Sequence, residues 1–370
     1  MDKTKILIFP LDIDEADTFI RVVHALCLAT VGASSAMAGP GDKMVDAFIP
    51  LPFITDPAFE PAFRDALEQH AVTTVYAPHQ GVWRYLDTLL KAHPERFSFT
   101  LCKPDPFSAT QQRFAPHEDW ARSMSSGHPP AGLAAPGATH PPLSQARYAA
   151  LHRQFLGIPG DSDVGKLHAL CDIVRVLPPG DLLEVGCLYG RSAFALGYLA
   201  GQYKLGSVIC VDPWNTVELT DQGAEAAVIN AELANPDIDC ETIFRVFLSA
   251  VASLENIGYI RKTSEKAIGD YEAAIRHGEL PSPELGSIPV GGRLSLLHID
   301  ANHRYDHVRR DVELWSPYLT AGGWLLLDDY VWAFGDGPRR LGDELLGSSL
   351  YDSAFVSGDT LFLRRTDVTG

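Results

Sequence analysis

Two apolar runs in the C-terminal half constrain the fold most strongly, LSLLHID at residues 294–300 and WLLLDD at residues 324–329. Neither run alternates regularly between apolar and polar positions, and this pattern is typical of strands buried on both faces of a parallel sheet. A helical pattern at residues 306–317 separates them. Two such strands joined through a helix form a β-α-β unit, so the sequence predicts an α/β fold for this half.

Further strands and helices alternate through the rest of the C-terminal half. Strands are expected at residues 182–186, 208–213, 258–261, 294–300 and 324–328, and helices at residues 147–155, 165–177, 192–200, 265–277, 306–317 and 339–346. Residues 354–357 and 360–364 predict a hairpin across Gly358-Asp359. The expected fold is therefore a parallel sheet finished by an antiparallel hairpin, with a helical insertion at about residues 221–254.

The N-terminal residues predict a second, smaller α/β domain over residues 1–102. Strands are expected at residues 5–10, 30–33, 46–50, 73–77 and 97–102, with helices at residues 15–29, 57–70 and 82–92. The strand KILIFP and the helix after it resemble the nucleotide-fold domain that precedes the ATP-grasp core of carboxylate ligases, but no such core follows. No G-x-G-x-x-G follows this strand either. We expect a role in substrate docking or subunit contact.

Between these domains the composition changes, and we expect a linker over residues 103–145. The stretch SSGHPPAGLAAPGATHPPL is rich in Pro, Gly, Ala and Ser, so it can bury little apolar surface to offset its chain entropy. The C-terminal domain is then expected to cover residues 146–370. A chain of 370 residues exceeds what one hydrophobic core usually organises, which agrees with two domains.

Charge and composition narrow the classes of partner. The net charge of −17 argues against nucleic acid, which needs a basic face. No apolar run is long enough to span a membrane, and the N-terminus does not have the pattern of a secretory signal. The six cysteines lack C-x-x-C spacing and are expected to be reduced thiols in the cytoplasm. A small-molecule substrate is expected, and a homo-oligomer stays open.

A glycine-containing loop joins the first strand of the C-terminal domain to the next helix. Its motif comprises Glu184, Gly186, Cys187, Tyr189, Gly190 and Ser192. Gly186 permits a sharp turn and the close approach of a ligand, although a simple turn glycine is the alternative. Ser192 could cap the helix. Asp212 ends the following strand, where an acid either accepts hydrogen bonds from ribose hydroxyls or caps a loop.

This loop followed by Asp212 resembles the S-adenosylmethionine (SAM) fingerprint of class I methyltransferases. The resemblance implies that Glu184 and Gly186 lie by the amino-acid end of SAM and that Asp212 holds the ribose. It implies adenine contacts for Thr263 and Ser264, although Ser264 could instead cap the helix that follows. Cys187, Tyr189, Gly190 and Ser192 complete the expected cofactor residues.

Acidic residues end both apolar runs of the C-terminal half. Asp300 follows one strand, and Asp328 and Asp329 follow the next. Because parallel strands end at the same edge of a sheet, three carboxylates are expected to converge, and they repel one another unless a cation neutralises them. Oxygen ligands suit Mg²⁺, with Mn²⁺ as the alternative. Alternatively, these acids only solvate a turn or cap a helix.

The segment at residues 298–330, HIDANHRYDHVRRDVELWSPYLTAGGWLLLDDY, resembles metal-dependent O-methyltransferases that act on sugars of macrolide antibiotics, the macrocin and mycinamicin types. It is also similar to the cephalosporin-hydroxylase-like group. The family pattern is an Asp, a His three residues later and an acidic pair, matched here by Asp300, His303 and Asp328-Asp329. The first acid of the pair is often Glu in the family, and Asp328 reaches less far. The resemblance covers about residues 165–365.

The resemblance implies a class I methyltransferase, Rossmann-like, that methylates a hydroxyl of a glycosyl or polyhydroxylated natural product. Asp300, Asp328 and Asp329 are then metal ligands and His303 is the general base, since an imidazole titrates near neutrality. His303 could alternatively cap a helix, or pair with His307 at a zinc site. Catechol and phenol O-methyltransferases usually have Lys at the position of His303. A non-catalytic scaffold that kept the fold is the remaining alternative.

Overall fold

The computed structural model describes residues 5–126, 140–220 and 239–366, and the chain divides into two compact units, Met1–Pro116 and His117–Gly370. The boundary lies within helix α4 (Pro106–Ser125), which has Pro116 in its interior. Residues 103–145 are predicted to be a linker, and residues 106–125 of this segment form a helix. Residues 127–139, the centre of the Pro/Gly/Ala-rich stretch, lie outside the described part of the chain.

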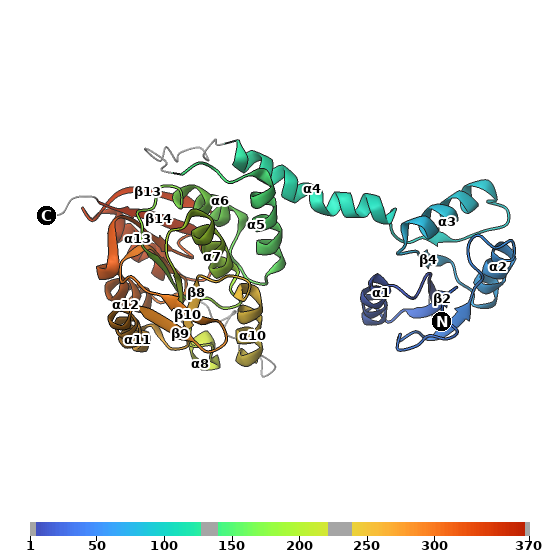
Figure 1. Ribbon diagram of the computed structural model, residues 1–370, viewed down its shortest axis with the longest axis horizontal. Coiled ribbons are helices and arrows are strands. Elements are labelled where there is room, and N and C mark those ends of the chain that lie inside the picture. The colour runs from blue at the N-terminus through green and yellow to red at the C-terminus, as the bar shows by residue number, and fades with distance from the viewer. Residues whose placement is uncertain (1–4, 127–139, 221–238, 367–370) are drawn as a thin grey trace. The chain divides into compact units, whose positions relative to one another are not determined.

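The first unit is a parallel sheet covered by helices (Figure 1). Its elements are β1 (Lys5–Ile8), α1 (Asp14–Ala25), β2 (Ala29–Ser34), β3 (Ala47–Pro50), α2 (Phe59–Gln69), β4 (Thr74–Tyr76), α3 (Gln80–Ala92) and β5 (Thr100–Leu101). The strand order is β3-β2-β1-β4-β5. Apolar side chains of α2 and α3, Phe59, Phe63 and Leu86 among them, pack on the sheet and explain the helical stripes seen in the sequence.

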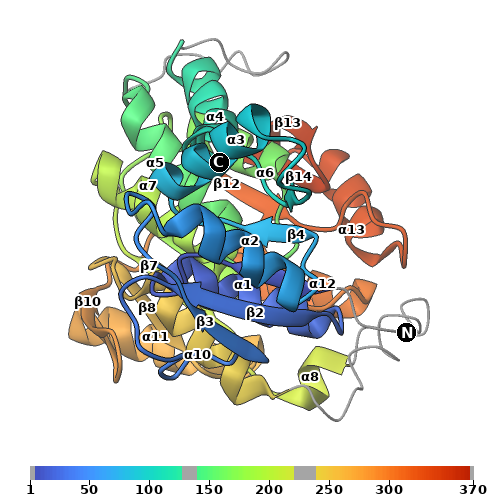
Figure 2. The same cartoon turned by 90° about the vertical axis from the view of Figure 1, so that its right-hand side faces the viewer.

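The second unit has a sheet of seven strands in the order β13-β14-β12-β11-β6-β7-β8. These are β6 (Asp181–Val185), β7 (Val208–Val211), β8 (Ile257–Ile260), β11 (Leu294–Ile299), β12 (Leu319–Leu327), β13 (Tyr351–Ser357) and β14 (Thr360–Arg365). All neighbours pair in parallel except at the β13–β14 hairpin and its contact with β12. Figure 2 shows this hairpin at one edge of the unit and β8 toward the other. The predicted class I, Rossmann-like fold is confirmed.

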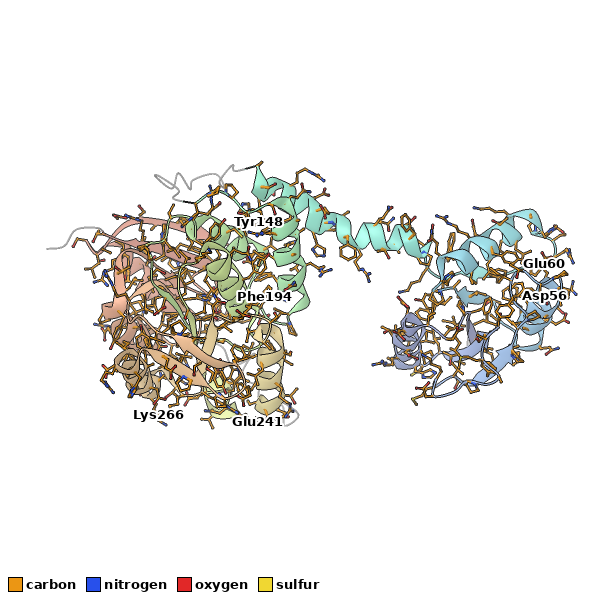
Figure 3. All side chains as sticks on the ribbon, in the orientation of Figure 1. Asp56, Glu60, Tyr148, Phe194, Glu241 and Lys266 are labelled. Atoms are coloured by element: carbon orange, nitrogen blue, oxygen red, sulfur yellow. The ribbon has the colours of Figure 1, made fainter. Side chains whose placement is uncertain are left out.

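Helices cover both faces of this sheet. They are α5 (Gln145–Gly157), α6 (Val164–Ile173), α7 (Arg191–Tyr203), α8 (Thr216–Thr220), α10 (Cys240–Val251), α11 (Ser264–His277), α12 (Tyr305–Trp315) and α13 (Gly337–Leu346). Helices α5, α6, α7 and α10 build the core on one face, and α11, α12 and α13 build it on the other (Figure 1). Tyr148 of α5 and Phe194 of α7 are buried in the first of these layers (Figure 3).

Strand residues alternate between the two cores. In β11, Leu296 packs on one face and Leu297 on the other, so the strand has no solvent-exposed face, as its unbroken apolar pattern predicted. An unpredicted hairpin, β9 (Glu279–Ser282) with β10 (Gly286–Pro289), follows α11. Its short, Pro-containing strands bury few side chains, so their pattern is weak. Of the helical insertion expected at 221–254, residues 221–238 lie outside the described chain.

The chain reverses its direction of travel across the sheet at β6. From β6 it moves outward to β7 and β8, and then returns to β11 on the other side of β6. Loops that leave β6 and β11 therefore diverge, which creates a crevice at the carboxyl ends of these strands. The register pairs Val185 with Ile299 and Ile299 with Leu327, so Gly186, Asp300 and Asp328 follow at the same level.

Candidate active site

A cavity of about 970 Å³ opens at this edge of the second unit. Its wall is formed by residues 159–162, 185–189, 211–215, 263–266, 300–303 and 328–329 together with several side chains from elsewhere. We call the part formed by residues 185–192, 211–215 and 263–266 the loop end, and the part formed by Asp300, His303, Asp328, Asp329 and Asp359 the acidic end. Most expected site residues line the cavity, but Glu184 and Gly190 do not.

Both glycines of the loop are needed by the chain itself. Gly186 has φ +87°, and a Cβ there would lie 2.0 Å from the Asp300 carbonyl oxygen. Gly190 has φ +86° and is the N-cap residue of α7, where a Cβ would meet Phe247 at 2.9 Å. Gly186 is therefore required by the close approach of two loops of the chain, and it also lines the cavity, where the approach of a ligand to Gly186 stays a prediction. Ser192 is not the cap, because Gly190 occupies that position.

The Asp212 carboxylate accepts hydrogen bonds from three backbone N–H groups. Its donors are Cys187 at 2.8 Å, Leu188 at 3.0 Å and Trp214 at 2.7 Å. Burial raises the pKa of Asp212, and these donors oppose that shift. Asp212 thus has the loop-capping role that we considered as an alternative, and it also lines the cavity. It fixes the path of the glycine loop and of Trp214, whose indole N–H donates to the Leu188 carbonyl at 2.8 Å.

The far part of the loop end is formed where α11 begins. Thr263 occupies the N-cap position without a side-chain hydrogen bond, and the helix begins at Ser264. Ser264 is therefore not the cap; its hydroxyl accepts a hydrogen bond from the Trp315 indole at 2.7 Å. Burial raises the pKa of the neighbouring Asp311 to about 6, opposed by a hydrogen bond from Ser264. Thr263, Ser264 and Asp311 all line the cavity.

Glu184 lies inside the sheet rather than in the cavity wall. Its carboxylate is 2.9 Å from Nδ1 of His298 on the neighbouring strand, and both side chains are buried. The other ring nitrogen of His298, Nε2, lies 3.8 Å from an Asp300 carboxylate oxygen. Ligand atoms of Glu184, His298 and Asp300 lie within 4.8 Å of one another, so Glu184 lies behind the acidic end. Glu184 is not part of the cavity wall, where the resemblance implies a contact with the cofactor.

The three acids predicted from the strand ends converge. Asp300, Asp328 and Asp329 each offer an oxygen, and these oxygens lie within 4.8 Å of one another. Burial and the adjacent Asp328 raise the pKa of Asp300 well above its ordinary value, although Lys166 opposes the shift. The carboxylates repel one another in a site shielded from water, and a dication with oxygen ligands would relieve that repulsion. The donor set therefore fits Mg²⁺ or Mn²⁺.

A buried lysine that the sequence did not reveal reaches the same cluster. Lys166 of α6 contacts Asp328 through its ammonium group, which also lies 3.8 Å from an Asp300 oxygen and 3.2 Å from the Ser162 hydroxyl. Only 1% of the Lys166 side chain is exposed. Burial lowers the pKa of Lys166, but Asp328 and Asp300 outweigh burial and raise it. The ammonium is therefore a permanent charge within the acidic end.

The loop that carries Ser162 is fixed by another residue outside our predictions. Arg191, the first residue of α7, donates to the carbonyl oxygens of Ile158 at 2.7 Å and Ser162 at 3.1 Å. Its guanidinium also lies over the Phe155 ring, 5.5 Å from the centroid. The arginine follows the glycine loop directly, so one short segment shapes the loop end and anchors residues 158–162 beside Lys166.

His303 lies beside the acids in the cavity wall. Its Nε2 is 2.6 Å from an Asp329 carboxylate oxygen, and its ring lies 4.0 Å from the ring of Trp332 at an interplanar angle of 30°. Phe334 packs edge-on against Trp332 at 5.4 Å. Nε2 donates to the Asp329 carboxylate, and Nδ1 is buried without a hydrogen-bond partner among the described residues. His307 lines the cavity, but no candidate metal group among the described residues includes it.

Comparison with known proteins identifies the class of this unit. Residues 183–330 match the family model described as "Methyltransferase domain". The matched segment runs from β6 to the residue after the acidic pair, so it contains the glycine loop, Asp212, His303 and all three acids of the cluster. This part of the chain is a SAM-dependent methyltransferase domain of class I fold.

Several solved methyltransferase structures are similar to the chain at low identity. The O-methyltransferase NovP is 14% identical, with 68% of this chain and 99% of NovP covered and a TM-score of 0.41. The calicheamicin methyltransferase CalS11 is 15% identical over 72% of this chain and 95% of its own, with a TM-score of 0.39. MycE of the mycinamycin pathway is 14% identical over 63% and 57%, with a TM-score of 0.35. No curated protein matches the chain.

The length and hydropathy of the described helices bear on whether any of them could cross a membrane. In the described ranges, each helix is too short or too polar to span a bilayer.

Proposed function

We propose that this protein transfers the methyl group of SAM to a hydroxyl of a glycosyl or other polyhydroxylated natural product, with a divalent cation and a histidine base. The observation that carries the proposal is the convergence of Asp300, Asp328 and Asp329 in the same cavity as the glycine loop. A methyl donor and an activated hydroxyl must lie within bonding reach of each other, and one cavity provides both environments.

The loop end is the proposed cofactor site. Asp212 and the loop residues Cys187, Tyr189 and Ser192 line it, and Thr263 and Ser264 line its far part. When bound, SAM supplies an electrophilic methyl group on a sulfonium. The loop keeps this region rigid, because Asp212 satisfies three backbone N–H groups and two glycines hold the turn. We propose that Asp212 accepts hydrogen bonds from the ribose in addition.

The acidic end is the proposed metal and acceptor site. Asp300, Asp328 and Asp329 would hold Mg²⁺ or Mn²⁺, which stabilises the negative charge that develops on the acceptor oxygen. Asp329 orients the His303 ring through Nε2, and the imidazole of His303 is the proposed acceptor of the hydroxyl proton. His303 is itself held against Trp332, so the base is fixed before the acceptor arrives.

An aromatic wall made of Trp332 and Phe334 borders the base. The apolar C–H face of a sugar ring packs well on such rings, while its hydroxyls reach the carboxylates. A catechol or phenol ring could also stack on the same wall. Phenolic acceptors are therefore the second acceptor class to test. We propose a supporting role for the first unit, in acceptor docking or subunit contact, and a cytoplasmic location for the protein.

Calorimetry with the full chain tests the proposal first. SAM should bind with or without EDTA, and Mg²⁺ should bind to the SAM complex only without EDTA. If SAM binds and metal does not, the metal-dependent mechanism is wrong. If neither binds, the chain is a scaffold that kept the fold.

A screen with isotope-labelled SAM then identifies the acceptor class. Glycosides with adjacent hydroxyls should become labelled in the presence of Mg²⁺, as read by mass spectrometry. Labelling of catechols alone would replace the glycosyl acceptor with the phenolic one.

A further inference from the structure

Lys166 is the one described cation in direct contact with the acidic cluster that lies deep in the core. It belongs to α6, a helix that contributes otherwise to the apolar packing of the sheet. Its ammonium contacts Asp328, and the Ser162 hydroxyl and an Asp300 oxygen lie at 3.2 and 3.8 Å. Burying an ammonium group costs free energy unless the group is paired. The acidic cluster must therefore account for the burial of Lys166.

Both carboxylate oxygens of Asp328 already have protein partners. One contacts the Lys166 ammonium, and the other accepts a hydrogen bond from the Thr360 hydroxyl. Asp328 is only 7% exposed. Asp329, by contrast, contacts only the imidazole of His303 among the interactions described, and 16% of its side chain is exposed. The acids are therefore unequal, and Asp328 is the one that a protein cation holds.

The charges of the acidic end do not balance with lysine alone. Asp300, Asp328 and Asp359 interact with a single ammonium group. The other basic groups described there are the imidazoles of His298, 3.8 Å from an Asp300 oxygen, and His303, 2.6 Å from an Asp329 oxygen. The remaining negative charge would still attract a divalent cation, but the Lys166 ammonium would repel that cation at close range. Like charges a few ångströms apart in a shielded site repel by far more than they do in water.

We propose that Lys166 is a built-in counter-cation that competes with the divalent metal for Asp328 and thereby weakens metal binding. The site then depends chiefly on Asp300 and Asp329 for its affinity, and Asp328 is shared between ammonium and metal. Such a site releases its metal more easily than three unshared carboxylates would. The inference rests on the proposed metal site and deepens it.

Replacing Lys166 with methionine is the first test, because methionine has a similar length and no charge. Binding of Mn²⁺ to the full chain is measured by electron paramagnetic resonance of the free ion. The Lys166→Met variant should bind Mn²⁺ about tenfold more tightly or better, which corresponds to about 1.4 kcal/mol. Lys91→Met is the matched control, since Lys91 pairs with Asp87 at 2.7 Å on the surface of the first unit, and its affinity should equal that of the parent.

The double variant Lys166→Met/Asp328→Asn removes both charges and gives the second test. If the effects of Lys166 and Asp328 on metal binding cancel, the Mn²⁺ affinity of the double variant should lie within about threefold of that of the parent protein. If Asp328 is a full ligand and Lys166 is only structural, affinity should fall by about tenfold or more. Neutral pairs often replace buried ion pairs without loss of stability, so this variant decides the matter if Lys166→Met alone does not fold.

The outcomes separate this inference from the proposed function. Tighter binding by Lys166→Met, with measurable binding by the parent, supports both. Equal or weaker binding by a folded Lys166→Met overturns the inference and leaves the metal site intact. Binding by the variant but not by the parent supports the competition and overturns metal dependence of the natural protein. If neither binds Mn²⁺, both fail.

Discussion

At the loop end of the cavity, Asp212 is surrounded by backbone N–H groups, whereas at the acidic end Asp300 faces other carboxylates. The first arrangement satisfies a buried charge locally and holds a chain turn in place. The second leaves negative charge that the protein meets only in part, through Lys166. A site that is complete without a ligand serves to shape a surface, while a site with unbalanced charge invites a cation.

The difference also assigns separate tasks to the two ends. Substitutions at the acidic end should change the reaction, and those of the acids also metal binding, without changing SAM affinity. Substitutions at the loop end should change SAM affinity without changing metal affinity. The predictions below use this separation, since any residue that changes both properties would break it.

The largest effect is expected from Asp300→Asn. The amide has the same shape but no charge, so the acceptor oxygen loses stabilisation worth several kcal/mol, about a thousandfold in kcat. SAM affinity, measured by calorimetry, should stay within about twofold. Asp306→Asn, on the exposed first turn of α12, is the control and should keep full activity. A parallel loss of SAM affinity would mean that the two ends act as one unit.

His303→Ala should reduce kcat by about 10²–10⁴-fold, the usual contribution of a general base, while SAM and Mn²⁺ still bind. His307→Ala is the matched control, because His307 lines the same cavity four residues away. It should leave kcat within about threefold. If both variants lose activity equally and added zinc restores neither, His303 is not the general base. If both variants lose zinc binding, a zinc site formed by His303 and His307 gains support.

At the loop end, Asp212→Asn should weaken SAM binding by about 10–100-fold, the value of one or two hydrogen bonds to a charged group. Mn²⁺ affinity, measured in the same variant, should not change. Because Asp212 also holds the N–H groups of Cys187 and Leu188, circular dichroism is needed to show that the fold persists. Unchanged SAM affinity in a folded variant would reduce Asp212 to the loop cap alone.

The sequence was most informative where position along a strand determines position in space. Asp300 and Asp328 could be placed together because β11 and β12 are adjacent, parallel and end at one level. His303 followed from its place three residues after Asp300. These inferences needed only the apolar strand pattern and the rule that parallel strands end at a common edge.

The sequence was least informative about contacts between distant segments. Lys166 lies 162 residues from Asp328, and a lysine on a helix is normally expected at the surface. Gly186 was recognised, but nothing in a sequence shows that the Asp300 backbone also approaches it closely. Glu184 was assigned to the cofactor from its motif, although its strand position places it beside His298 inside the sheet.

The smallest effect concerns the stability of the loop end and comes from Asp311. Burial raises the pKa of Asp311 to about 6, compared with about 3.9 in an unfolded chain. Between these values the unfolded state loses its proton first, so this group makes the fold less stable as pH rises from about 4 to 6, and the penalty persists above. Asp311→Asn should therefore stabilise the protein by up to about 3 kcal/mol at pH 7.5.

The pH dependence distinguishes charge from packing in this last case. The gain in melting temperature should vanish at about pH 3, where Asp311 is protonated in both states, while Glu313→Gln on the exposed face of α12 should change little at either pH. An equal gain at both pH values would show that the amide improves packing or hydrogen bonding to Ser264. In that event the ionised Asp311 carboxylate does not destabilise the fold. Unbalanced negative charge would then be a property of the acidic end and not of the loop end.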